Sequence, residues 1–448
     1  MRTSQYRPLR AFSRAFLVFS IVAAPGRAPA QTAGSSAAAD RIQRDVAFLA
    51  SDALEGRLTG TPGNDSAAAF LAARVASLGL RAMIMDTTRT ACRAAPVPPL
   101  CSTFLQPFTA HGVEMARAGH PEGVATQNVV AMVPGRDVAL RGQYVVVGAH
   151  FDHLGRSTTG ALDPESKNVI RNGADDNASG TAAVLELARV FAGHAARRSI
   201  IFVNFSGEEM GLLGSQYFVE HAPIALDSIS AMLNFDMIGR LRNDKVIVYG
   251  VATATELPAI LDSANVIPKL ALSAVGDGFG PSDHASFYAK GIPVLHFFTD
   301  IHEDYHRASD QAEKINAPGE ARIVSMAERV VRAIADRPSK LTPVRAAAPA
   351  PAGSSRESIA AYLGSIPDMA AGDSPGLRLS GVRAGSPADA GGLKAGDVIV
   401  AFGDTTVKDL YAYTDALRAH KPGDSVRVVY VRAGERRETT VTLGSRPQ

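Results

Sequence analysis

The chain has 448 residues, which is enough for two domains with separate hydrophobic cores. Lys and Arg (46) nearly balance Asp and Glu (44), and the formal net charge is +2. This balance gives no electrostatic case for nucleic-acid binding, so nucleic acid is not an expected partner.

Residues 1–30 have the pattern of a secretory signal peptide. A basic segment that ends at Arg14 precedes the apolar run AFLVFSIVAA, and Ala28-Pro29-Ala30 supplies the small residues of a cleavage site. A membrane anchor is disfavoured because the apolar run is too short to span a bilayer and Pro25 closes it. The sequence therefore predicts a secreted protein, periplasmic or extracellular, with no stable membrane span after cleavage.

Two cysteines, Cys92 and Cys101, bracket the Pro-rich segment RAAPVPPL. In an oxidising compartment we expect a local disulfide between them. A thiolate metal site is disfavoured because the sequence has no further cysteine to complete it.

Apolar, β-branched runs alternate with helical patterns between residues 40 and 335. Residues 40–80 read as helical around the loop LEGRLTGTPGND. Buried strands are predicted at Gln127–Pro134, Tyr144–Gly148, Ile200–Phe205, Ala231–Phe235, Val246–Tyr249 and Pro293–Phe298. Helices are predicted at Thr181–Phe191, Leu212–Glu220 and Arg322–Ala335. The alternation predicts an α/β fold, with a mostly parallel mixed sheet sandwiched by helices.

The composition changes after Asp336. Residues 338–356 are rich in Pro, Ala and Ser without an apolar period, which is typical of an extended linker. Residues 357–448 then read as a small β-rich domain with one helix at Leu410–Arg418.

Side chains that can bind a metal ion lie at the ends of the predicted strands, where open α/β sheets bind ligands. These residues are His150, Asp152, Asp176, Glu208, Glu209, Asp236 and His306. Imidazole and carboxylate without thiolate suit zinc or a similar divalent ion at a catalytic site. One shared Asp would allow two ions about 3.5–4 Å apart, and a spare glutamate could accept a proton from water. The structural alternative is that Asp175, Asp176 and Asn177 only cap the helix beginning near Ser179.

The segment from His302 to His306 matches the zincin motif H-E-x-x-H, which needs a helix to bring both histidines to one face. Here the motif follows a predicted strand, and RASDQAEK after it has no apolar stripe. We therefore expect His302 and Glu303 to support the site loop. His153, His284 and His296 are not expected to be ligands.

Six short motifs follow one another along the chain: AHFDHLG, NGADDNASG, FSGEEMGLLGS, NFDMIGR, SDHASF and DYHRASD. Together with LASDALEGRLTGTPGN near the N-terminus, they resemble the M28 family of metallopeptidases, which are co-catalytic zinc aminopeptidases. The resemblance implies a zinc-exopeptidase type fold over residues 31–337.

The same resemblance implies two Zn²⁺ ions as cofactors. His150 and Asp236 would share one ion, and Glu209 and His306 would share the other. Asp176 would bridge the two ions.

Two further roles are carried over from the family. Glu208 would be the general base, and Asp152 would orient the imidazole of His150. By the same analogy the peptide bond between Asp176 and Asn177 is cis.

Residues 357–448 resemble a PDZ domain, most specifically at LKAGDVI, which begins at Leu393. PDZ domains bind extended peptides by strand addition, so a peptide ligand is a possible partner. The alternative is a packing or tethering module without a ligand.

The implied function is a secreted di-zinc metallo-aminopeptidase that removes N-terminal residues from peptide substrates with a metal-activated water and a glutamate base. A carboxypeptidase or dipeptidase of the same family is the nearest alternative. A glutaminyl cyclase of this fold is disfavoured because the two-metal set is complete. From a different class, the chain could be a non-catalytic peptide-binding PDZ protein.

Overall fold

The computed structural model describes Met1 and residues 31–445, except 87–91, 93–100, 113–114, 117–118, 164, 277, 279, 345–360, 368–375, 383–384 and 409. The predicted signal peptide and most of the predicted linker therefore lie outside the described residues. Among the helices that are described, none combines the length and the apolar character needed to cross a membrane.

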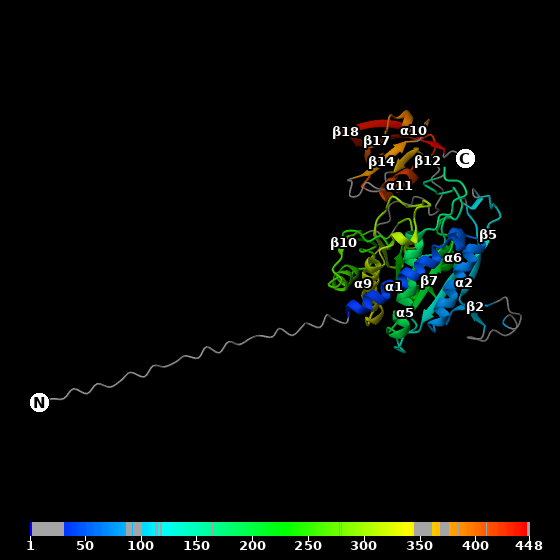
Figure 1. Ribbon diagram of the computed structural model, residues 1–448, viewed down its shortest axis with the longest axis vertical. Helices are drawn as coiled ribbons and strands as arrows, with labels where there is room; N and C mark the ends of the chain where they lie inside the picture. Colours follow the sequence, from blue (N-terminus) through cyan, green and yellow to red (C-terminus); the bar gives the residue numbers. More distant parts are fainter. Residues whose placement is uncertain are drawn as a thin grey trace.

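The first domain is built on a mixed sheet with nine strands among the described residues (Figure 1). Four neighbouring strands at its centre, in the order β7-β6-β8-β11, run parallel. On one side β5 runs antiparallel to β7, and on the other side β9 runs antiparallel to β11. The edge strand β10 runs parallel to β9. The bounds are β1 (Arg81–Ala82), β4 (Leu105–Ala110), β5 (Val124–Val133), β6 (Tyr144–His150), β7 (Ser199–Phe205), β8 (Ile229–Phe235), β9 (Lys245–Tyr249), β10 (Ala271–Ala274) and β11 (Val294–Phe298).

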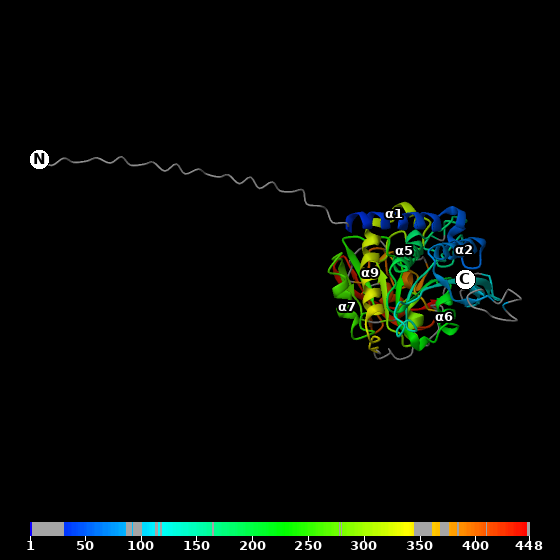
Figure 2. The ribbon, with the colours of Figure 1, turned by 90° about the horizontal axis from the view of Figure 1, so that it is seen from below.

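Both faces of the central strands are buried because their side chains alternate between two helical layers. In β6, Val145 and Val147 pack into one hydrophobic core while Val146 packs into the other. The first face is covered by α1 (Gln31–Leu49), α2 (Pro62–Ser77), α5 (Gly180–Gly193), α7 (Leu257–Ala264) and α9 (Ala317–Asp336). The second face is covered by α6 (Leu213–Glu220) and α8 (His284–Ala289). Figure 2 shows α6 on the side of the domain opposite α1. The predicted fold class is confirmed.

Two irregular turns matter for the site. A 3₁₀ turn, η1 (Asp52–Arg57), overlaps the start of the predicted loop LEGRLTGTPGND, whose last four residues form the first turn of α2. The turn η2 (Ala174–Ser179) precedes α5 and contains the cis peptide bond between Asp176 and Asn177, as expected by analogy. A small hairpin, β2 (Ile84–Met85) with β3 (Ser102–Thr103), flanks the Pro-rich segment, and Cys92 and Cys101 are joined by a disulfide.

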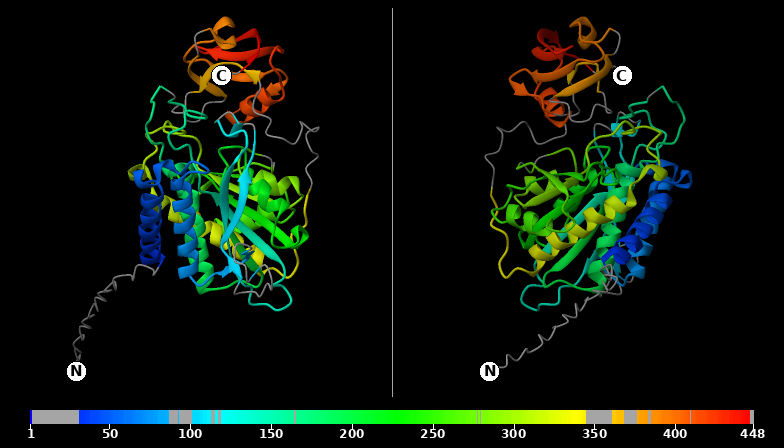
Figure 3. Two further views of the ribbon diagram at one scale, coloured as in Figure 1. Left: turned by 90° about the vertical axis from the view of Figure 1, so that its right-hand side faces the viewer. Right: turned by 60° about the vertical axis from the view of Figure 1, so that its left-hand side comes forward.

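The C-terminal unit is drawn in orange and red in Figure 3. It has its own hydrophobic core, which includes Leu379, Ile399, Phe402 and Val428. Its strands are β12 (Ala361–Tyr362), β13 (Ser365–Pro367), β14 (Leu377–Val382), β15 (Val398–Phe402), β16 (Thr405–Thr406), β17 (Ser425–Arg432), β18 (Glu435–Thr442) and β19 (Gly444–Ser445). Two helices, α10 (Pro387–Ala390) and α11 (Leu410–Arg418), complete it, the second with the predicted bounds.

Sequence patterns found the buried strands and missed the exposed elements. The predicted central strands agree with the observed ones within three residues at either end. The pattern did not reveal β4 and α7. The buried positions of β4 are Gln106, Phe108 and Ala110, which give no apolar alternation, and α7 is a short helix of eight residues.

Candidate metal centre

The carboxyl ends of the four parallel strands lie side by side. His150 ends β6 opposite Phe205, the last residue of β7, and Phe235 at the end of β8 pairs with Phe297 of β11. The segments after these strands therefore converge at one edge of the sheet, where open α/β folds bind their ligands.

A first cluster contains His150, Asp176 and Asp236, whose ligand atoms all lie within 4.8 Å of one another. His150 Nε2 lies 3.4 Å from Asp176 Oδ1 and 3.4 Å from Asp236 Oδ1. These three residues come from the end of β6, from η2 and from the end of β8, so the fold brings together positions far apart in the sequence.

A second cluster uses the other oxygen of Asp176. His306 Nε2 lies 3.1 Å from Asp176 Oδ2 and 3.2 Å from Glu209 Oε2. Because Asp176 presents Oδ1 to the first cluster and Oδ2 to the second, its carboxylate lies between the two.

Both histidines present Nε2 to the carboxylates because Nδ1 is held by a backbone carbonyl. His150 Nδ1 is 3.2 Å from the carbonyl oxygen of Asp152, and His306 Nδ1 is 2.9 Å from that of Gly160. A carbonyl oxygen can only accept, so each Nδ1 carries the hydrogen and Nε2 is free to ligate in the neutral imidazole. This is the usual arrangement around a metal-binding histidine.

The donor atoms fit a pair of divalent ions. Ligands on a tetrahedral zinc ion, with bonds of about 2.0–2.1 Å, lie about 3.3 Å from one another. The separations in both clusters, 3.1–3.4 Å, match this value. In addition, Asp236 Oδ1 is buried and has no hydrogen-bond donor among the described residues, while Oδ2 accepts from Ser282. A cation at the first cluster would satisfy this oxygen.

The electrostatics also favour a cation. Burial alone would lower the pKa of His150 and His306, but the facing carboxylates, Asp236 and Glu209 foremost, raise both pKa values well above the ordinary value. Burial and the nearby Glu209 carboxylate raise the pKa of Asp176. The site therefore holds positive charge as protonated imidazole when no metal ion is bound.

Zinc binding at neutral pH should release protons, because a ligating imidazole must be neutral. The raised pKa values of His150 and His306 keep both rings protonated in the metal-free protein, so zinc affinity should increase as pH rises through those values. Calorimetric titrations at about pH 7, in two buffers with different ionisation enthalpies, measure the release. Identical heats in the two buffers would contradict it.

Asp152 does not orient His150 in the expected way. Its carboxylate lies 3.7 Å from His150 Nδ1, beyond hydrogen-bond distance, and the closer acceptor is its own backbone carbonyl. The turn after β6 directs the carboxylate elsewhere. Oδ1 accepts from the backbone N–H of Glu208 and Oδ2 accepts from Thr59. Asp152 therefore ties the segment that carries Glu208 and Glu209 to the end of β6.

The H-E-x-x-H segment forms turns and is not helical, as expected. His302 Nε2 lies 3.1 Å from Asp175 Oδ2, which supports the turn that carries Asp176. Glu303 is exposed and takes no part in that support. Asp310 does, because its Oδ2 accepts from the backbone N–H groups of Asp175 and Asp176.

Two further residues lie at the site: His153, which the sequence analysis considered only as a non-ligand, and Tyr305, which it did not single out. His153 Nδ1 is 2.7 Å from Glu209 Oε1. Tyr305 stacks on His306 with ring centroids 3.9 Å apart. Burial, followed by the carboxylates of Asp176 and Glu209, raises the pKa of the Tyr305 phenol well above its ordinary value, so it remains protonated. Its position directly before His306 was the available signal.

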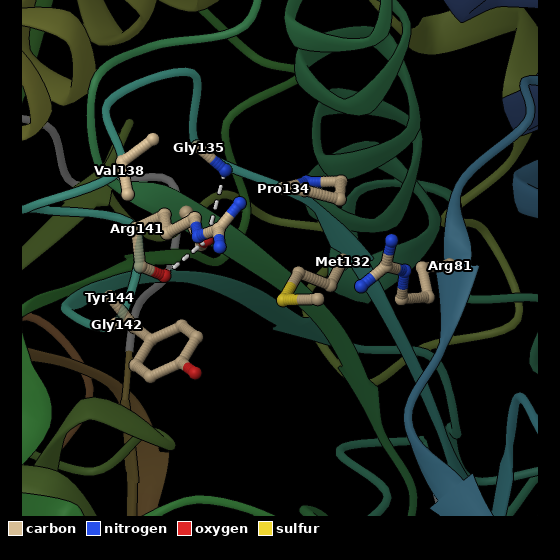
Figure 4. Close-up of a pocket in the computed structure, with 9 residues that line it drawn as sticks. Arg81, Met132, Pro134, Gly135, Val138, Arg141, Gly142 and Tyr144 are labelled. Carbon is tan, nitrogen blue, oxygen red and sulfur yellow. Dashed lines mark hydrogen bonds between the residues drawn. The ribbon is translucent and has the colours of Figure 1, made fainter. Parts of the chain in front are cut away.

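A pocket of about 530 Å³ opens at the opposite end of β6, beside Tyr144 (Figure 4). It is lined by Arg81, Met132, Pro134, Gly135, Val138, Arg141, Gly142, Tyr144 and Ser199. The lining has no carboxylate or imidazole, so it offers no metal ligands. We therefore place the chemistry at the two clusters and not in this pocket.

Over about half of its length the chain is similar in sequence to known enzymes. Leupeptin-inactivating enzyme 1 of Streptomyces exfoliatus is 34% identical over 216 residues, which are 48% of this chain and 42% of that protein. Leucine aminopeptidase 1 of Uncinocarpus reesii is 32% identical over 225 residues, which are 46% of this chain and 53% of that protein. The chain thus spans about half the length of the curated relatives it matches.

A solved structure of a zinc aminopeptidase from Bacillus subtilis superposes with a TM-score of 0.51. The match covers 67% of this chain and 95% of that one at 16% identity, so it shows a shared fold. The sequence profile of peptidase family M28 matches residues 128–331, which include every residue of the two clusters, and the PDZ profile matches residues 361–443. Residues 128–331 are therefore similar to peptidase family M28, and residues 361–443 are similar to PDZ domains.

Proposed function

We propose that this protein is a secreted aminopeptidase that uses two zinc ions and removes N-terminal residues from peptides. The observation that carries the proposal is the shared carboxylate of Asp176, which faces a separate His-carboxylate set with each of its oxygens. The names of the two curated relatives, a leucine aminopeptidase and a leupeptin-inactivating enzyme, favour peptide chemistry.

In this proposal His150 and Asp236 would hold one ion, and His306 and Glu209 would hold the other. Asp176, which faces both clusters, would be shared between them. When bound, such ions act as Lewis acids that polarise a carbonyl and lower the pKa of water towards about 7.

Glu208 is the proposed general base. Its carboxylate helps to raise the pKa of both His150 and Tyr305, so it lies near the first cluster and near the tyrosine beside His306. The residue is 7% exposed, and its backbone N–H donates to Asp152. Glu208 takes a proton from the attacking water and returns it to the leaving amine.

Tyr305 is the proposed donor to the oxygen that becomes negative during attack on the carbonyl. Its phenol stays protonated because burial and the nearby carboxylates raise its pKa. A protonated phenol next to His306 can stabilise that charge with one hydrogen bond.

Tyr305→Phe should therefore lower kcat about 10- to 100-fold, because a hydrogen bond to a charged group contributes about 1.5–3 kcal/mol. KM and bound metal should change little, since the ring and its stacking on His306 remain. Steady-state kinetics with metal analysis measures both quantities. A loss of metal, or an unchanged kcat, would remove Tyr305 from the reaction.

The direction of cleavage decides between the leading function and its alternatives. Purified mature protein is assayed on aminoacyl and N-blocked peptides, with and without a chelator. Chelator-sensitive cleavage restricted to substrates with a free amine is the expected result. Release of C-terminal residues from blocked peptides would instead indicate a carboxypeptidase, and binding without cleavage would indicate a peptide-binding PDZ protein.

A further inference from the structure

We propose that His153 is a positioning residue, which fixes the carboxylate of Glu209 and so sets the affinity of the second cluster for its ion. The proposal rests on the two-ion site of the proposed function. It assigns a role to a buried histidine that the reaction itself does not use.

Glu209 is held at both oxygens. Its Oε1 lies 2.7 Å from His153 Nδ1, and its Oε2 lies 3.2 Å from His306 Nε2. The carboxylate therefore turns one oxygen towards the cluster while the other is occupied by a hydrogen bond. Without that bond, rotation of the carboxylate could move Oε2 away from His306 or present both oxygens.

His153 could also be considered a ligand, because its Nδ1 and the carboxylates of Asp176 and Glu209 lie within 4.8 Å of one another. The distances oppose that role. Nδ1 and Oε1 are separated by 2.7 Å, which is a hydrogen-bond length and shorter than the separation of about 3.3 Å between two ligands of one zinc ion. A carboxylate only accepts, so Nδ1 carries a hydrogen and has no lone pair for a metal ion.

The ring of His153 is held rigidly, as a positioning residue requires. The residue is fully buried, and its backbone N–H donates to the carbonyl of Arg57. Gly173 allows the ring to lie against the chain, since a Cβ there would be 2.4 Å from His153 Cγ. The ring of His306 meets it edge-on, with centroids 5.7 Å apart.

Burial of His153 has a cost that a structural role does not explain. Its Nε2 is buried and has no hydrogen-bond partner among the described residues. An unpaired buried polar group costs about 1–3 kcal/mol, and an apolar side chain of similar size would avoid it. The hydrogen bond from Nδ1 to Glu209 is the feature that an apolar side chain cannot replace.

The test compares His153→Leu with His153→Asn in the full chain. Leu removes the donor, whereas Asn places an amide N–H near the position of Nδ1 and is not expected to bind zinc. Metal-free protein is titrated with Zn²⁺, and with Co²⁺ while the visible absorption is recorded. In the Leu variant we expect the second ion to bind about 10- to 100-fold more weakly, with a changed Co²⁺ spectrum, while the first ion binds as in the wild type. Asn should restore most of the affinity.

Three results would overturn the proposal. The Leu variant could bind both ions as tightly as the wild type does. The affinity for both ions could instead fall equally, which would indicate a packing role. Alternatively Asn could fail to restore binding, which would make His153 a ligand.

The titrations need no substrate, so they test His153 independently of the proposed activity. A wild-type chain that binds two ions but cleaves no peptide would refute the activity alone, and one that binds fewer than two ions would refute the two-ion site itself.

Discussion

Glu208→Gln should lower kcat by about 10²- to 10⁴-fold, the usual contribution of a positioned general acid–base group. Gln keeps the size and polarity of the side chain, but it cannot take a proton from water at neutral pH. The backbone N–H of residue 208, which donates to Asp152, is unaffected by the substitution. Metal content should therefore remain near that of the wild type, and KM should change little.

The neighbouring residue supplies the control for this prediction. Glu209→Gln should weaken the binding of the second ion, because Glu209 Oε2 faces His306 in that cluster. Kinetics and metal analysis of both variants then separate the two adjacent glutamates. If Glu208→Gln lost an ion while Glu209→Gln kept both, the proposed roles would have to be exchanged.

Much of this site could be predicted from sequence because its residues follow buried strands. His150 ends one buried strand, and Asp236 directly follows another. Both strands are apolar at successive positions, because both faces of the sheet are covered, and such runs are easily predicted as strands. Parallel neighbours bring such ends together, and imidazole with carboxylate then predicts a metal ion. The M28 resemblance added which of the adjacent glutamates serves as base.

Other features depend on contacts that no local pattern shows. Nothing in the motif AHFDHLG reveals that His153 turns towards Glu209, or that the carboxylate of Asp152 lies 3.7 Å from His150 Nδ1, beyond hydrogen-bond distance. Both follow from the turn after β6, where the strand period ends and the side-chain direction is set by tertiary contacts. The role of Asp310 likewise appears only when its carboxylate is seen to hold the turn at Asp176.

Arg57 is the clearest case of a residue whose importance lies in its contacts. Its side chain is fully buried, although it lies in a segment that reads as a loop. The guanidinium donates to four backbone carbonyls, those of Leu49, Phe151, Asn172 and Gly173. It thereby joins the end of α1 to the segment after His150 and to the segment before Asp176.

The charge of Arg57 is also retained. Burial lowers the pKa of Arg57 to about 10, against the opposing effect of Asp152 and Asp176, so the group is charged at neutral pH. The cation offsets part of the repulsion among the buried carboxylates of the metal centre. Removing it leaves four carbonyls without this donor and the carboxylates without the charge of Arg57.

Arg57→Met should therefore destabilise the first domain by about 3–5 kcal/mol, the range for removing one partner of a buried charged interaction. Arg57→Lys should be intermediate, because an ammonium keeps the charge but cannot reach four carbonyls in a planar fork. The matched control is Arg136→Met. Its ion pair with Asp336, at 3.6 Å, is partly exposed, so we expect an effect below about 1 kcal/mol.

Urea unfolding with a chelator present, followed by circular dichroism, measures these differences without the stabilisation that bound metal adds. A second measurement, zinc titration of the folded Lys variant, tests whether Arg57 also sets the spacing of the ligand loops. Because the segments it joins carry His150 of the first cluster and the shared Asp176, both ions should bind more weakly. This pattern differs from that of His153, whose loss should weaken only the second ion. If Arg57→Met had the same free energy of unfolding as the wild type, the four carbonyls would have other donors and the loops would not need Arg57 for their stability.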